Sequence, residues 1–217
     1  MNVALLPAKP LSVAKTRLGT VLDDTDRAAV SSAMFDDVLA ALVGARRLGA
    51  IIVVTADRRL AARARSTGAV VLDEGRPRGL NGAVALGTAA SLALGAAAVL
   101  VVLTDIPLLQ PADVDELFDR TPERGALLVP SKEGTGTNAM VRRPATIFPP
   151  RFGGRSLERH VAAAEHQRLP CEIWRNARIG FDVDTPEDLR AFATAESRTA
   201  TYREVLRLGL VPLRPSA

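Results

Sequence analysis

Short apolar runs alternate with segments of helical spacing along the first half of the chain. Apolar runs cover residues 2–7, 50–56, 69–73 and 97–105, and helices are predicted near 25–43, 58–66, 81–94 and 111–120. Because the runs are apolar on both faces, they predict buried strands of a mainly parallel sheet. The alternation indicates an α/β fold of three layers, in which helices flank both faces of the sheet.

The pattern changes beyond residue 122. Two apolar runs, 126–130 and 138–143, flank a glycine-containing loop and predict a hairpin, which would make the sheet mixed. A helix near 156–166, strands at 171–174 and 178–184, and helices near 186–195 and 201–208 are predicted to follow. Thr185 and Asp188 have the spacing of a capping box at the start of the 186–195 helix. We expect the 201–208 helix to dock on its own domain rather than on a partner.

Composition and charge narrow the functional classes. The chain has 217 residues, of which 47% are hydrophobic, and this is ample material for the core of one domain. The net charge is +4, and the basic residues are mostly arginines spread along the chain. This charge is compatible with a GC-rich genome or with a field that attracts anions. No basic run contains interleaved aromatic residues, so we predict no nucleic-acid partner.

Cysteine content and hydropathy predict a cytoplasmic protein. Cys171 has no second cysteine to pair with, and with His160 and His166 it does not give a usual zinc-site spacing. The first residues do not have the pattern of a signal peptide. The stretch 79–104 carries no charge and is long enough to span a bilayer. Gly95 interrupts it before a β-branched run that predicts a strand, so we expect no membrane span.

Three aspartates are the first candidate for chemistry. Asp182 and Asp184 lie two apart in the predicted strand 178–184, so they would project from one face roughly 7 Å apart. Asp105 ends the apolar run 97–105, at the edge where parallel sheets bind ligands. Three carboxylates at this edge would suit a hard divalent cation, typically Mg²⁺. The alternative is that Asp105 caps the turn before Pro107 and the other two are solvated at a sheet edge.

The first strand-to-helix loop is a candidate phosphate site. It reads "PAKPLSVAKTRL" and carries Lys9, Lys15 and Arg17. The first loop of a parallel α/β domain commonly binds phosphate. It lacks the glycine-rich fingerprints of dinucleotide-binding and Walker loops. A surface loop with scattered basic residues is the alternative.

Two further segments begin predicted helices. Asn81 can be a helix N-cap, or its backbone neighbourhood with Gly79 can approach a base edge. Gly153 and Ser156 lie at the junction where the 156–166 helix begins, and there they can hold a small anion or form a plain loop–helix junction. His160 on that helix is interpreted as a packing or capping residue rather than a catalyst.

Six short motifs follow one another from residue 1 to about 190: "PAK…AKTRL", "GLN.A", "TDIP", "GTN", "FG..S…H" and "DVDTPEDL". In this order they resemble the 2-phospholactate or phosphoenolpyruvate guanylyltransferases of coenzyme F-420 biosynthesis, the CofC/FbiD-like family. The resemblance implies a GT-A-like, Rossmann-like nucleotidyltransferase fold, Mg²⁺ as cofactor and GTP as donor. The family transfers the guanylyl group to the phosphate of a three-carbon acid and releases pyrophosphate.

The resemblance also implies roles for individual residues. The implied metal ligands and catalytic acids are Asp105, Asp182 and Asp184. The GTP phosphates would be held by Lys9, Lys15 and Arg17, of which Lys15 and Arg17 are also catalytic, and the guanine by Gly79 and Asn81. The acceptor acid would be held by Thr137, Gly153 and Ser156. The first loop departs from the glycine-rich signature of many related nucleotidyltransferases, so side chains would have to hold the phosphates.

The chain is predicted to form one main domain that binds a nucleotide and a small acid. Residues 1–195 would form one domain, with a nucleotide-binding half at 1–122 and an acceptor and metal half at 123–195, followed by a C-terminal helix and tail at 196–217. Phosphoenolpyruvate is the favoured acceptor, and 2-phospho-L-lactate is the next. A homodimer is considered, as is a downstream transferase that receives an unstable product. The alternatives are another acceptor, such as 3-phosphoglycerate, molybdopterin or a sugar phosphate, and a non-catalytic nucleotide-binding protein.

Overall fold

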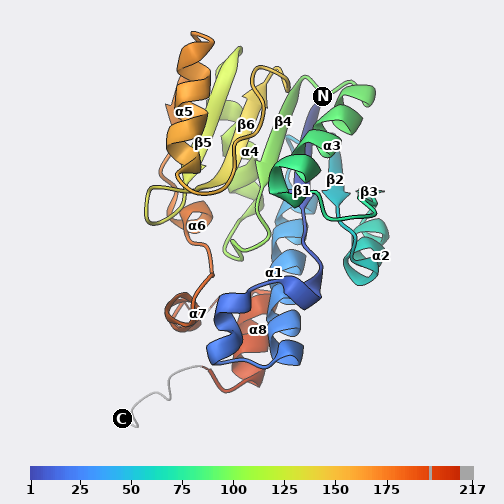
Figure 1. Ribbon diagram of the computed structural model, residues 1–217, viewed down its shortest axis with the longest axis vertical. Coiled ribbons are helices and arrows are strands. Elements are labelled where there is room, and N and C mark those ends of the chain that lie inside the picture. Colours follow the sequence, from blue (N-terminus) through green and yellow to red (C-terminus); the bar gives the residue numbers. More distant parts are fainter. Residues whose placement is uncertain (196, 211–217) are drawn as a thin grey trace.

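A single seven-stranded sheet organises the computed structural model of this chain, which describes residues 1–195 and 197–210 (Figure 1). The strands are β1 (Asn2–Pro7), β2 (Ala50–Val54), β3 (Val70–Leu72), β4 (Ala98–Val102), β5 (Gly125–Pro130), β6 (Thr137–Arg143) and β7 (Cys171–Ile173). Their spatial order is β3-β2-β1-β4-β6-β5-β7, and β6 is antiparallel to both of its neighbours. The predicted mixed, mainly parallel sheet with a β5–β6 hairpin is confirmed.

Helices cover both faces of the sheet. They are α1 (Asp24–Gly44), α2 (Arg58–Ser66), α3 (Gly79–Ala93), α4 (Pro111–Arg120), α5 (Ser156–His166), α6 (Ala177–Gly180), α7 (Pro186–Ala193) and α8 (Ala200–Arg207). Two 3₁₀ helices, η1 (Leu11–Val13) and η2 (Thr16–Thr20), lie in the loop after β1. Residues of α1, α2, α4 and α6 pack on one face, and residues of α3 and α5 on the other. The three-layer arrangement is therefore confirmed.

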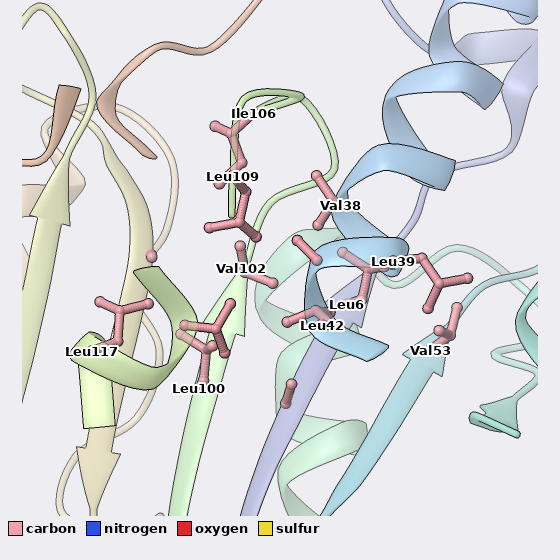
Figure 2. Packing of buried hydrophobic residues seen from close by; sticks show 14 of the residues in the cluster. Leu6, Val38, Leu39, Leu42, Val53, Leu100, Val102, Ile106, Leu109 and Leu117 are labelled. Carbon is pink, nitrogen blue, oxygen red and sulfur yellow. The ribbon is translucent and has the colours of Figure 1, made fainter. Parts of the chain in front are cut away.

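The strands are apolar on both faces because alternate residues enter different cores. Leu6 and Leu100 belong to the cluster under α1, together with Val38 and Leu42 (Figure 2). Leu5, the neighbour of Leu6, belongs to the cluster on the opposite face. Successive side chains of a strand point to opposite faces, so strands buried on both sides have nearly continuous apolar runs.

A third cluster lies beyond the carboxyl edge of the sheet. It joins residues of η2, α1, α7 and α8, including Leu18, Phe192 and Val205. The Asp37 carboxylate on α1 accepts hydrogen bonds from the backbone N–H groups of Ala200 (2.6 Å) and Thr201 (2.8 Å) at the start of α8. Thus α8 packs on the chain's own helix α1, as expected. Among the described residues, no helix combines the length and hydropathy needed to cross a membrane.

The predicted strand at 178–184 is wrong. The Asn176 side chain accepts hydrogen bonds from the backbone N–H groups of Arg178 and Ile179 and caps the short helix α6. Residues 181–184 then form a segment without regular structure, held to the end of β4 by one backbone bond from Val183 N–H to the Asp105 carbonyl oxygen (2.9 Å). Ile179 and Val183, the apolar residues that suggested a strand, are buried, but they lie in α6 and in this irregular segment rather than in a hydrogen-bonded strand.

The order of the strands places a crevice at one edge of the sheet. β1 and β4 are parallel neighbours near the centre of the sheet. From β1 the chain continues to β2 on one side, and from β4 it continues through α4 to β5 on the other. In open α/β sheets such a reversal leaves a crevice outside the carboxyl ends of the two strands. The loop with the three basic residues follows β1, and Asp105 follows β4, so both flank this crevice.

Candidate active site

A cleft of about 710 Å³ lies at the carboxyl ends of β1 and β4. Six of the residues singled out from the sequence line it: Lys9, Lys15, Arg17, Gly79, Asp105 and Asp184. Apolar residues of the first loop and of α3, such as Leu11 and Leu80, line other parts of it. The cleft thus combines basic groups, carboxylates and apolar surface, which is the mixture that a nucleotide requires.

Lys15 lies between two of the three aspartates. Its ammonium Nζ donates to Asp105 Oδ2 at 2.7 Å and to Asp184 Oδ1 at 2.5 Å, and the lysine side chain is only 10% exposed. Burial lowers the pKa of Lys15, but the charges of the two carboxylates outweigh burial and leave this pKa raised. The carboxylates therefore lie close together around a positive charge, and in this structure that charge belongs to Lys15.

The backbone of Lys15 is as unusual as its side chain. Its φ of +51° places it in the left-handed region, which non-glycine residues seldom adopt. It immediately precedes η2, so this conformation turns the chain after η1 and directs the ammonium toward Asp105. Residues in such conformations often mark functional sites, where surrounding contacts hold them in place.

Asp182 projects from the same segment as Asp184 but binds a different group. Its Oδ1 accepts a hydrogen bond from Asn138 Nδ2 at 3.1 Å. Burial raises the pKa of Asp182, and the negative charges of Asp105 and Asp184 raise it further. The carboxyl group of Asp182 is therefore close enough to be affected by the charges of Asp105 and Asp184, although Asp182 and Asp184 do not belong to a strand.

Two residues that the sequence reasoning missed hold this acidic segment. Asn138 is buried, and its Nδ2 also approaches the carbonyl oxygens of Ile179 (3.0 Å) and Gly180 (3.3 Å). Lys132, in the β5–β6 loop, donates to the Asp182 carbonyl oxygen at 3.0 Å and forms an ion pair with Asp188. Asn138 lies within the "GTN" motif, so its position was visible, but its partners are more than 40 residues away in the sequence.

The capping box predicted at the start of α7 is confirmed. Asp188 Oδ2 accepts from the backbone N–H of Thr185 (2.8 Å), and Thr185 Oγ1 accepts from the backbone N–H of Asp188 (3.3 Å). Asp188 Oδ2 also accepts from the backbone N–H of Asp184 at 3.0 Å. The cap therefore fixes the backbone of a candidate ligand as well as the helix.

Replacing Asn138 tests this support. In Asn138→Ala, the carbonyl oxygens of α6 lose a buried donor, which costs about 1–3 kcal/mol of unfolding free energy. We expect this loss in urea denaturation followed by circular dichroism. Asn2→Ala is the matched control, because the Asn2 amide makes one exposed hydrogen bond to Arg47 and should cost less than about 1 kcal/mol. Equal losses in the two variants would contradict the role given to Asn138.

Asn81 does not line the cleft, and it is not the N-cap of its helix. The N-cap of α3 is Arg78, and Asn81 lies in the first turn. The Asn81 amide binds the backbone of Phe152, accepting from its N–H at 2.8 Å and donating to its carbonyl oxygen at 3.1 Å. Asn81 therefore fastens the loop that contains Gly153 to α3, whereas Gly79 does line the cleft.

The residues expected to hold the acceptor are joined by hydrogen bonds outside this cleft. Ser156 Oγ donates to Thr137 Oγ1 at 3.2 Å, and Thr137 Oγ1 is 3.1 Å from His160 Nδ1. All three side chains are buried. Gly153, in the adjacent loop, has a φ of +111°, a conformation that side chains rarely permit. The expectation that His160 packs in the interior is confirmed, and the structure adds its polar partners.

The buried state of His160 predicts a dependence of stability on pH. Burial lowers the pKa of His160 to about 4, and the nearby cations Arg142, Arg151 and Arg159 lower it in the same direction. The unfolded chain binds a proton near pH 6.5 and the folded chain only near pH 4, so unfolding is favoured as the pH falls through this window. This proton contributes up to about 3 kcal/mol.

We expect the unfolding free energy of the wild type to fall between pH 6.5 and 4, and that of His160→Gln to fall less. Chemical denaturation at several pH values measures both slopes. Equal slopes would show that His160 does not bind its proton more weakly in the folded state.

The acidic residues are suited to bind a divalent cation, but they do not form a complete set of metal ligands by themselves. Within residues 1–195 and 197–210, no group of three or more His, Cys, Asp or Glu side chains is placed to hold a metal ion. Lys15 and Asn138 engage the carboxylates instead. Asp105 Oδ1, however, is buried and has no hydrogen-bond partner. A buried carboxylate oxygen without a donor is a suitable ligand for Mg²⁺, which is usually bound by one or two carboxylates together with substrate phosphates.

Curated relatives match most of the chain. A phosphoenolpyruvate guanylyltransferase of Sphaerobacter thermophilus is 37% identical over 192 residues, which are 88% of this chain and 92% of the relative. A 3-phospho-D-glycerate guanylyltransferase of Phenylobacterium zucineum is 37% identical and covers 87% of this chain and 88% of its own. A 2-phospho-L-lactate guanylyltransferase of Methanothermobacter thermautotrophicus is 32% identical, and the match covers 98% of this chain and 93% of the relative. Relatives of similar identity thus carry names with three different acceptors.

A solved structure supports the fold, and a family model covers the chain. The putative nucleotide-diphospho-sugar transferase from Desulfovibrio desulfuricans has a TM-score of 0.79 at 18% identity, covering 97% of this chain and 96% of its own. The predicted nucleotidyltransferase-like fold is therefore confirmed. The model described as "Guanylyl transferase CofC like" matches residues 2–216. The chain belongs to the CofC-like guanylyl transferase family.

Proposed function

We propose that this protein transfers the guanylyl group of GTP to the phosphate of a three-carbon phospho-acid and releases pyrophosphate, a step of coenzyme F-420 biosynthesis. The observation that carries the proposal is the cleft at the carboxyl ends of β1 and β4, which is lined by three basic residues and by Asp105 and Asp184. A triphosphate needs positive groups along its length, and a nucleotidyltransferase needs carboxylates where phosphate charge is neutralised. The guanylyltransferase relatives support GTP as the nucleotide.

The reaction requires that the two substrates are positioned and that their negative charges are neutralised, and it does not require a strong base. An oxygen of the acceptor phosphate attacks the α-phosphorus of GTP, and the bond from that phosphorus to the β-phosphate oxygen breaks in line with the attack. The acceptor phosphate is already an anion at neutral pH, so no general base has to remove a proton. The residues that line the described cleft include no histidine or cysteine, which agrees with this chemistry.

The basic residues of the first loop counter the charge of the donor. Lys9 and Arg17 would bind the phosphates of GTP, and Lys15, which can exchange its carboxylate partners for phosphate, would stabilise the departing pyrophosphate with Arg17. The side chains perform this function because the loop lacks a glycine-rich cradle. Gly79 would lie near the guanine.

The acidic residues would hold Mg²⁺. Asp105, with its unpartnered Oδ1, and Asp184, in the same cleft, are the first ligands, and Asp182 is the third. When bound, the ion offsets the negative charge of the two phosphate groups that must approach each other. Lys132 and Asn138 would keep Asp182 and Asp184 oriented toward it.

The acceptor is proposed to be phosphoenolpyruvate, with 2-phospho-L-lactate as the second choice. Several of the relatives carry the first name, at 37–39% identity, which supports this order. Thr137, Gly153 and Ser156 would bind the acid. We expect the reaction to take place in the cytoplasm, and a homodimer and a downstream transferase that takes the product remain proposals.

An acceptor screen tests the proposal. The purified protein is incubated with GTP, Mg²⁺ and phosphoenolpyruvate, 2-phospho-L-lactate or 3-phosphoglycerate, and pyrophosphate release is followed. We expect release with phosphoenolpyruvate, and little release when ATP replaces GTP or when Mg²⁺ is withheld. No release with any of the three acids would contradict the proposed function, and release with 3-phosphoglycerate alone would replace the acceptor.

A further inference from the structure

His160 lies at the centre of the three segments that carry the predicted acceptor residues. Its Nδ1 is 3.1 Å from Thr137 Oγ1 at the start of β6, and its Nε2 accepts from the backbone N–H of Arg151 at 2.9 Å. It belongs to α5, the helix that begins with Ser156. One fully buried side chain thus connects a strand, a helix and the loop that contains Gly153.

The hydrogen bonds determine which nitrogen of His160 carries the proton. A backbone N–H can only donate, so Nε2 must be the unprotonated acceptor of the Arg151 N–H. The neutral ring then carries its proton on Nδ1 and donates it to Thr137 Oγ1. Protonation of Nε2 would place two donors against each other, and the nearby arginines disfavour a positive charge on the ring.

Aromatic rings and a second pair of hydrogen bonds surround this arrangement. The Phe152 ring meets His160 edge-on, with centroids 4.9 Å apart, and the Phe148 ring lies 6.4 Å away. The Phe152 backbone is held by both polar atoms of the Asn81 amide. The loop is therefore fixed between α3, in the half that carries Gly79, and α5, in the half that carries Ser156.

We propose that His160, as the Nδ1–H tautomer, is a positioning residue that sets the affinity for the acceptor acid by holding Thr137 and the 151–154 loop in place. This inference rests on the proposed function. His160 does not line the cleft that contains the basic loop, so it should leave the affinity for GTP unchanged. Thr137 Oγ1 receives hydrogen bonds from both Ser156 and His160, so its own proton remains available for an anion.

Three substitutions of His160 test its hydrogen bonds to Thr137 and Arg151 separately. Asn has an amide nitrogen near the position of Nδ1, so His160→Asn can keep the bond to Thr137 and lose the one to Arg151. Gln has an amide oxygen near the position of Nε2, so His160→Gln can keep the bond to Arg151 and lose the one to Thr137. His160→Phe keeps the aromatic contacts and loses both bonds. His166, the exposed second histidine at the end of the same helix, supplies the control His166→Phe.

The proposal predicts a change in KM for the acid alone. We expect His160→Asn and His160→Gln to raise this KM by about 3- to 10-fold and His160→Phe by more, since each lost bond has the size of one neutral hydrogen bond. The KM for GTP and the kcat should change by less than about 2-fold. Hydrogen exchange should show faster exchange of the 151–154 amides in His160→Asn and His160→Phe than in His166→Phe.

Two outcomes overturn the inference, and a third overturns its basis. An unchanged acid KM in a folded His160→Phe protein would overturn it, as would equal increases in KM for GTP and for the acid, because a general loss of structure gives that pattern. A wild-type protein that releases no pyrophosphate overturns the proposed function instead. Changed exchange of the 151–154 amides would still support the structural role of His160 in that case.

Discussion

Asp184→Asn is expected to lower kcat by at least about 100-fold while the protein remains folded. The Asp184 carboxylate lines the cleft and lies within 2.5 Å of the Lys15 ammonium, in the electrostatic centre of the site. Removing its charge removes one principal stabiliser of the transition state, and single losses of this kind cost about 10²–10³ in kcat. Pyrophosphate release under saturating GTP and acid measures the effect.

The fold should tolerate this substitution because the Asp184 side chain is 41% exposed and its backbone, not its carboxylate, is held by Asp188. Asp119→Asn is the matched control. Asp119 is similarly exposed, at 52%, and forms a surface ion pair with Arg47 outside the cleft. The control should keep full activity. Near-normal activity of a folded Asp184→Asn protein would refute the role given to this carboxylate.

Lys15→Met is expected to lower kcat by about 100-fold and to change the response to magnesium. Without the lysine, Asp105 and Asp184 face each other with no positive charge between them. Breaking a fully buried ion pair costs about 3–5 kcal/mol, and the partial exposure of both carboxylates should reduce this value here. The melting temperature of the variant should therefore be lower than that of the wild type in the absence of Mg²⁺.

Magnesium should then stabilise Lys15→Met more than the wild type. In the wild type the ion has to displace the Lys15 ammonium from two carboxylates, whereas in the variant those oxygens are free. A ligand raises the melting temperature according to its affinity for the folded state. A thermal melt with and without Mg²⁺ compares the two proteins without any need for activity. Equal shifts would argue against a metal at the position of the ammonium.

Much of the fold was accessible from the sequence because its central strands are buried on both faces. β4 has no polar position and β1 has one, Asn2 at its start, so their apolar runs predicted strands directly. The parallel arrangement followed from the helices between them. The edge of the sheet that carries Asp105 and the basic loop followed from that arrangement. The cleft therefore brought together six residues that the sequence had singled out.

Other features depend on contacts that a sequence pattern does not encode. The run before Asp182 is apolar enough for a strand, but the Asn176 cap and the Asn138 donor favour α6. The amide of Asn81 has the same appearance in the sequence whether it binds a base or the Phe152 backbone. Local spacing could not reveal the Asn138 donor or the Phe152 backbone, because these partners lie 41 residues from Ile179 and 71 residues from Asn81.

The destination of the α-phosphate of GTP distinguishes guanylyl transfer from other uses of the nucleotide. The protein is incubated with Mg²⁺, phosphoenolpyruvate and GTP that carries a labelled α-phosphate, and the label is traced by chromatography and mass spectrometry. We expect the label to join the acid in one product, with an equal amount of pyrophosphate and no labelled protein. Label found only in GMP, or bound covalently to the protein, would contradict direct guanylyl transfer to the acid.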